Sequence, residues 1–152
     1  MKLKLLKMMM MTWAFFAASI TWAQSVDISG DYKTTFSYSM MVKSGDGSAG
    51  DGVLPIVSIE PVDEGHVNIT LPPFVFSDKM KIESFVIENV ELSQDDNGSL
   101  LFIKKFSSND GNYEISGYGL SGSIKKGKLD MKVVYKAGKM PFKLTVNYLS
   151  YE

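Results

Sequence analysis

The sequence predicts an all-β fold, an eight-stranded antiparallel up-and-down barrel. From residue 29 onward, apolar and polar side chains alternate with a period of two, which is typical of strands with one buried and one wet face. Turn signals separate these runs at short intervals, so strands that follow each other should pair antiparallel. No stretch after residue 23 has the periodicity of an amphipathic helix. We expect strands at 30–42, 53–60, 66–71, 80–92, 99–107, 113–124, 128–136 and 141–149.

Alternation defines the first, third, seventh and last of these strands most clearly. Each has one predominantly apolar row, and the residues between are mostly Lys, Ser, Thr, Asn or Asp. The rows are Tyr32, Thr34, Phe36, Tyr38 and Met40; Val67, Ile69 and Leu71; Leu129, Met131, Val133 and Tyr135; Phe142, Leu144, Val146 and Tyr148.

Turn-forming residues bound the other strands. A Gly-, Asp- and Ser-rich loop is expected at 44–52, and Pro72-Pro73 ends a strand because neither residue can donate to a ladder. Asn97-Gly98 is a strong hairpin signal. Eight strands of this length can close into a barrel, which removes sheet edges. A two-sheet β-sandwich is the alternative.

Three glycines interrupt the strand at 113–124. Gly117, Gly119 and Gly122 weaken a strand unless the backbone geometry requires them. Sharp coiling of a barrel strand is the explanation we prefer, and close approach of a ligand is the alternative.

Residues 1–23 have the features of a secretory signal. Lys2, Lys4 and Lys7 precede an apolar stretch at 8–20, and Ala23 offers a small residue for cleavage. The apolar stretch is shorter than the roughly 20 residues of a membrane span. No Cys follows it, so a lipid anchor is not expected. We therefore expect a signal peptide at 1–23, one domain at 24–152, and export to the periplasm or the extracellular space.

The composition excludes several kinds of site. The chain has no Cys, no Arg and one His, so thiolate chemistry, guanidinium clamps and His-rich metal sites are absent. After residue 23 it has 13 Lys and 17 acids, a net charge of −4. That balance argues against nucleic-acid and anionic-membrane partners. His66 has no partner evident in the sequence, so we expect no enzyme activity, no cofactor and no metal.

Several segments resemble a known family. Gly30-Asp31-Tyr32 is similar to the Gly-x-Trp step of lipocalins and their calycin relatives, with Tyr in place of Trp. Val67–Phe74, Ile82–Val90, and the Gly-rich strand followed by Lys128–Val133 resemble the calycin-like β-barrel domain of exported Bacteroidales proteins. The resemblance covers about residues 28–149. It implies an eight-stranded calycin-like barrel in an exported protein and names no activity.

The resemblance also implies how one barrel end is packed. In lipocalins the Trp of this step packs against an Arg near the last strand, and this chain has no Arg. Lys143 or Lys139 is therefore expected to stack on Tyr32, next to Gly30, as a cation–π substitute.

Two functional hypotheses remain from the sequence. In the first, the barrel interior binds a small apolar or amphipathic ligand, because eight strands can enclose one. In the second, the core is filled and the protein is an envelope interaction or scaffold protein. It would then act through its outer face or loops, such as 44–52 or the apolar segment Leu71–Phe76. The candidate lining for the first is Phe36, Tyr38, Met40, Phe102, Met131, Tyr135 and Leu144. No membrane span is expected after signal removal, and the oligomeric state is left open.

Overall fold

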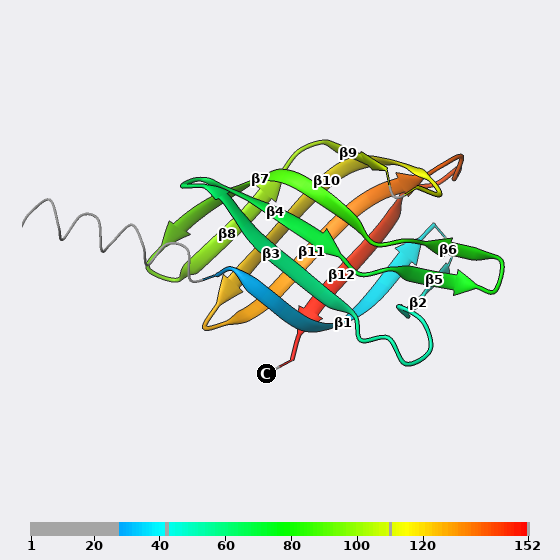
Figure 1. Ribbon diagram of the computed structural model, residues 1–152, viewed down its shortest axis with the longest axis horizontal. Helices are drawn as coiled ribbons and strands as arrows, with labels where there is room; N and C mark the ends of the chain where they lie inside the picture. Colours follow the sequence, from blue (N-terminus) through cyan, green and yellow to red (C-terminus); the bar gives the residue numbers. More distant parts are fainter. Residues whose placement is uncertain (1–27, 42, 110, 152) are drawn as a thin grey trace, which may run out of the picture.

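A computed structural model describes residues 28–151 except 42 and 110 (Figure 1). The predicted signal at 1–23 lies outside these residues. No helix in the described part of the chain is long and apolar enough to cross a bilayer. The strands are β1 (Gly30–Met40), β2 (Lys43–Asp46), β3 (Ile56–Asp63), β4 (His66–Leu71), β5 (Phe74–Ser77), β6 (Met80–Ile82), β7 (Phe85–Asp95), β8 (Gly98–Ile103), β9 (Phe106–Asn109), β10 (Glu114–Lys125), β11 (Lys128–Ala137) and β12 (Leu144–Ser150).

Eight of these strands form a closed antiparallel ring. The ring order is β1, β3, β4, β7, β8, β10, β11 and β12, and β12 pairs back onto β1. The pairing of β10 with β11 completes the closure. Each ring strand therefore pairs with the ring strands before and after it in the sequence, as Figure 1 shows. The predicted up-and-down barrel is confirmed, and the sandwich alternative is wrong.

Extra strands account for most differences from the predicted boundaries. The loop expected at 44–52 contains β2, which pairs with the end of β1. The strand expected at 80–92 is divided at residues 83–84 into β6 and β7, and the strand expected at 99–107 is divided at 104–105 into β8 and β9. The strand expected at 30–42 ends at Met40, because Met41 has a φ of 41°.

The residue after β2 is a glycine that lies close to β1. The Gly47 N–H donates to the Phe36 carbonyl at 2.7 Å. A Cβ at Gly47 would lie 2.0 Å from the Phe36 ring, so a larger residue could not follow this path. A composition typical of loops therefore also permits a short strand packed against β1.

Strands β5 and β6 form a hairpin that pairs only with itself within the described residues. It leaves the barrel after Pro72-Pro73, where β4 ends as predicted. The Ser84 hydroxyl donates to the Leu71 carbonyl at 2.6 Å, and the Val75 N–H donates to the Ser48 carbonyl at 2.8 Å. These bonds hold the hairpin across one end of the barrel, which we call the hairpin end (Figure 1).

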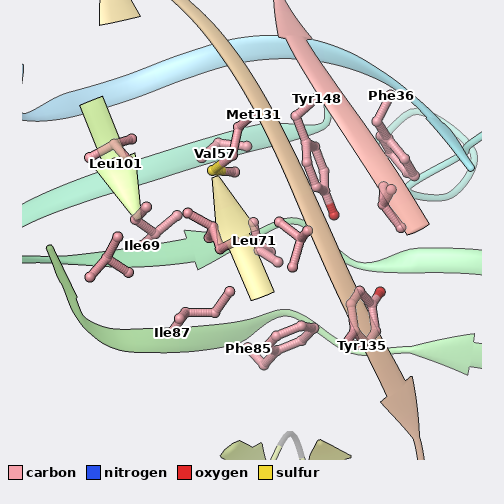
Figure 2. Packing of buried hydrophobic residues seen from close by; sticks show 14 of the residues in the cluster. Phe36, Val57, Ile69, Leu71, Phe85, Ile87, Leu101, Met131, Tyr135 and Tyr148 are labelled. Carbon is pink, nitrogen blue, oxygen red and sulfur yellow. The ribbon is translucent and has the colours of Figure 1, made fainter. Parts of the chain in front are cut away.

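The core lies inside the ring and follows the pleat of each strand. On β11, Leu129, Met131, Val133 and Tyr135 are buried while the residues between them face outward. The same pattern holds on β4 and β12. Figure 2 shows these side chains converging from several strands into one packed interior.

The glycine-rich strand coils sharply for a packing reason. The register of β10 against β11 shifts between Gly117 and Gly119. A Cβ at Gly117 would lie 2.3 Å from the Phe106 ring of β9. Packing against Phe106 therefore explains this glycine, because the ring occupies the space that a side chain would need.

Gly117→Val is expected to lower the free energy of unfolding by about 1–3 kcal/mol, because the new side chain must displace the Phe106 ring. Denaturant unfolding measures the change. Gly65→Ala is the matched control: nothing lies within 4 Å of its added Cβ, so its effect should stay within about 0.5 kcal/mol. Equal losses in both variants would contradict the packing explanation.

Candidate functional site

The predicted ligand-lining residues divide into three groups. Met131, Tyr135 and Leu144 are at most 1% exposed and lie in the interior, and Phe36 is also buried. Tyr38 and Met40 are half-buried near the hairpin end, since they follow Phe36 on the inward face of β1. The structure thus brings six of the seven residues to the inner side of the barrel.

The prediction that the seventh residue, Phe102, faces the interior is wrong. It is 50% exposed on the outer surface, and Leu101 is the buried residue of this pair. The run Leu100 to Ile103 is apolar on both faces, so alternation alone does not set its orientation. The register with β7 sets it, because Leu101 lies opposite the half-buried Leu92.

Two aromatic rings meet across the interior. Phe85 on β7 and Tyr135 on β11 have ring centroids 5.3 Å apart in an edge-to-face arrangement. Two ring strands separate β7 from β11 on one side of the barrel and four on the other. The contact therefore joins two non-adjacent strands through the interior (Figure 2).

An aromatic cluster closes the hairpin end. Phe74 of the hairpin is 1% exposed, and its ring centroid lies 5.2 Å from Phe36 and 5.3 Å from Tyr38. Phe76 is half-buried, stacks on Phe74 at 4.1 Å and contacts Tyr38 at 5.5 Å. The segment at 71–76 is therefore largely engaged with the barrel.

Two buried phenols lie beneath this cluster. Tyr148 contacts Phe36 at 5.2 Å between ring centroids, and both Tyr135 and Tyr148 are 1% exposed. Burial, followed by the electrostatic influence of Tyr135, raises the pKa of the Tyr148 hydroxyl well above its ordinary value. No buried side-chain nitrogen or oxygen in the described residues lacks a hydrogen-bond partner. Thr34 and Ser99 are the other buried polar residues of the described chain.

The predicted packing of Tyr32 against a lysine is wrong. The Tyr32 hydroxyl donates to the Ile28 carbonyl at 2.6 Å. Thr34 on β1 pairs with Ser150 at the end of β12, so Lys143, which precedes β12, lies at the hairpin end. Lys139 lies there too, just after β11 ends. Gly30 opens β1 as expected, with a φ of 134°.

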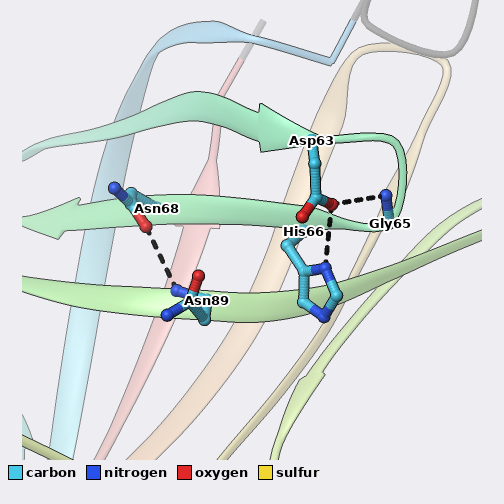
Figure 3. Close-up of polar contacts among 5 residues, drawn as sticks. All are labelled: Asp63, Gly65, His66, Asn68 and Asn89. Atoms are coloured by element: carbon cyan, nitrogen blue, oxygen red, sulfur yellow. Dashed lines mark hydrogen bonds and ion pairs between the residues drawn. The ribbon is translucent and has the colours of Figure 1, made fainter.

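His66 has a partner that the sequence analysis did not identify. Its Nδ1 lies 2.8 Å from Asp63 Oδ1, which also accepts a 2.9 Å bond from the Gly65 N–H (Figure 3). The pair closes the β3–β4 turn, and both side chains are largely exposed. The bond to His66, and then the bond from Gly65, holds the pKa of Asp63 below its ordinary 3.8. The spacing Asp-x-x-His across a tight turn was the available signal.

Other polar contacts near this turn are structural. The Asn68 side chain accepts a 3.1 Å bond from the Asn89 N–H where the register of β4 and β7 shifts (Figure 3). Within the described residues, no three His, Asp or Glu side chains gather closely enough to hold a metal ion. The bonds of Asp63 and Asn68 therefore explain the local backbone at this turn and at the neighbouring register shift.

The comparisons with known proteins agree with this architecture. Residues 28–150 match the calycin-like β-barrel domain. A crystal structure of a "putative outer membrane protein" from Bacteroides fragilis superposes with a TM-score of 0.71 at 21% sequence identity. The match covers 84% of this chain and 52% of that one, so the chain spans about half the length of this neighbour. No curated protein shows significant similarity to the chain.

The protein thus belongs to the class of closed antiparallel β-barrels. More particularly, the chain belongs to the calycin-like β-barrel domain family, because the match extends over nearly all of the described residues. The resemblance inferred from its sequence motifs is confirmed.

Tyr148→Phe is expected to reduce the loss of stability at high pH. Because the folded-state pKa of Tyr148 is raised, its contribution to stability is fully present at pH values below the ordinary pKa of 10.0. This contribution is lost as the pH rises toward the folded-state pKa. Denaturant midpoints between about pH 9 and pH 11 measure the slope. The variant should have the shallower slope, and an identical slope in both proteins would contradict this account.

His66→Ala is expected to raise the pKa of Asp63 toward 3.8, because the main contact that lowers it is removed. NMR titration of the Asp63 carboxyl measures this directly. A lowered folded-state pKa stabilises the fold above the ordinary value, and the effect is lost as pH falls through the folded-state pKa. The variant should therefore lose less stability in acid, whereas an unchanged Asp63 pKa would show that His66 has no such role.

Proposed function

We propose that the protein is an exported, non-enzymatic binding protein of the cell envelope that contacts its partners through its outer surface, with its interior serving as a filled core. The Phe85–Tyr135 contact across the barrel is the main support. A ligand at this level would have to displace rings that already contact each other. Side chains at native packing density leave no room for another molecule.

The remaining space near the barrel also favours the outer surface. A gap of about 10 Å³ next to Val67 and Leu92 is no larger than a single water requires. Two hollows of about 470 and 430 Å³ lie on the outside, one over β1 and β12 and one between β7 and β9. Thr35, Ser37 and Asn147 provide polar groups in the first.

Export and the absence of catalysis belong to this proposal. The charged and apolar stretches of residues 1–23 support export, and the outer-membrane description of the Bacteroides fragilis neighbour is consistent with it. The Asp63–His66 pair is explained by the turn that it closes. We therefore expect binding without chemical conversion of the partner.

A small amphipathic ligand inside the barrel is the second candidate. The hairpin of β5 and β6 pairs only with itself in the described residues, and its Phe74 packs on Phe36, which in turn contacts the buried Tyr148. If the hairpin moved away, a ligand would meet aromatic walls and two phenols. A ligand that enters in this way must displace Phe74.

Native mass spectrometry of the protein purified from its own cell envelope separates the two candidates. The filled-core proposal predicts the mass of the polypeptide alone. A stoichiometric small molecule that is retained by the native protein and lost on denaturation would contradict it and favour the interior site.

Phe74→Ala is expected to lower the free energy of unfolding by about 3–5 kcal/mol and to leave an apolar cavity at the hairpin end. Such a cavity should bind benzene, as a shift in the unfolding midpoint would show, while the unaltered protein does not. Phe142→Ala, at a residue 43% exposed, is the control and should change stability by less than about 0.5 kcal/mol. Benzene binding by the unaltered protein would indicate a pre-existing cavity.

A further inference from the structure

Charge is segregated along the chain. Residues 104–143 contain nine lysines and three acids, whereas the rest of the chain after residue 23 contains four lysines and fourteen acids. The near balance of the whole sequence hides this separation. Uneven charge of this kind points to binding of an oppositely charged partner.

The fold places the two kinds of charge on different walls of the barrel. Strands β3, β4 and β7 contain no lysine and present Glu60, Glu88 and Glu91 outward. Strand β11 presents Lys132 and Lys136 outward, and Lys143 lies beside them before β12. We call the outer surface of β8, β10, β11 and β12 the lysine wall. Its acids are Glu114 and Asp130, one toward each end of the barrel.

Exposed apolar side chains share this wall. Phe102, Leu100, Leu149 and Tyr118 are 50%, 47%, 51% and 41% exposed. The strand registers place Phe102 in one row with Ser121 and Lys132, and Leu100 in the next row with Ser123, Asp130 and Leu149. Each row therefore combines exposed apolar side chains with charged ones: Phe102 lies between Glu91 and Lys132, and Leu100 and Leu149 share a row with Asp130.

Tyr118 fixes two of the lysines in place. It projects where the β10 register shifts between Gly117 and Gly119. Lys143 Nζ lies 4.4 Å from its ring centroid and Lys136 Nζ lies 5.8 Å away. Within the described residues, neither lysine forms an ion pair, and neither does Lys132. Lys136 and Lys143 thus gather around one ring, although like charges repel one another.

We propose that the lysine wall docks on the anionic surface of a lipid bilayer. This inference rests on the proposed function, because it names the partner of the outer surface. The ammonium groups suit anionic headgroups, while Phe102, Tyr118 and Leu149 suit the boundary between headgroups and acyl chains. Proteins that bind single-stranded nucleic acid usually do so in a groove. A barrel wall is convex, so a broad anionic surface is the partner that suits it better. The net charge of −4 alone predicts the opposite, because it averages over the acidic and the lysine-bearing walls.

Co-sedimentation with vesicles tests the proposal on the protein purified from its cells. We use phosphatidylcholine vesicles with 30% phosphatidylglycerol and compare them with pure phosphatidylcholine. Binding should require the anionic lipid and should weaken as NaCl rises from 50 to 500 mM, because salt screens the lysines. Equal binding to both vesicle types, or none to either, would overturn the proposal.

Variants assign the binding to this wall. K132Q/K136Q/K143Q should lower the vesicle partition coefficient about 100-fold, at about fivefold for each lysine. K43Q/K79Q/K81Q removes the same amount of charge outside the lysine wall and should lower the partition coefficient less than about threefold. F102S should lower it about tenfold by removing an apolar contact. Equal losses in the two lysine variants would overturn the assignment.

Competing polymers distinguish a bilayer from other anions. Single-stranded DNA or dextran sulfate that binds while vesicles do not would overturn the membrane as partner. Failure of vesicle binding leaves the proposed function standing if the native mass spectrum shows the polypeptide alone. A bound interior ligand would instead remove the proposed function itself.

Discussion

The contact between Phe85 and Tyr135 is the constraint on which the account of this barrel depends. It joins two strands from distant parts of the ring through the interior. Phe74 extends the same packing to the hairpin end, where it meets Phe36 and Tyr38. Because the inward side chains pack against one another, stability comes from their burial and from closure of the ring.

The outward side chains differ from one wall of the barrel to another. In a strand, every second residue faces away from the core. Core packing does not restrict the type of these outward residues. The wall formed by β3, β4 and β7 has outward acids, whereas β11 has outward lysines, and the exposed Phe102 on β8 lies between them, opposite Glu91. The register shift between Gly117 and Gly119 affects both the packing and the outer surface. Gly117 leaves room for the Phe106 ring, and Tyr118 points outward.

The predictability of each element from sequence depended on how unequal its two faces are. Residues 128–136 alternate apolar with mostly polar side chains, so both the strand and its inward row were predicted correctly. Residues 99–103 are apolar on both faces, and only pairing with β7 determines that Leu101 is buried and Phe102 exposed. The hairpin of β5 and β6 and the pairing of Lys143 with Tyr118 depend on contacts between distant segments, which local patterns do not encode. The separation of charge could have been predicted, because it is visible in a count over residues 104–143.

The methyl group of Met131 offers the most direct test of the filled core, because this side chain is fully buried in the middle of β11. Its carbon-13 NMR signal can be followed while the protein is titrated with lipid extracted from its own envelope. The account predicts that the Met131 signal stays in place while the methyl signals of Leu149 on the lysine wall shift. A saturable shift of Met131 would show that a ligand enters the barrel and would contradict the account.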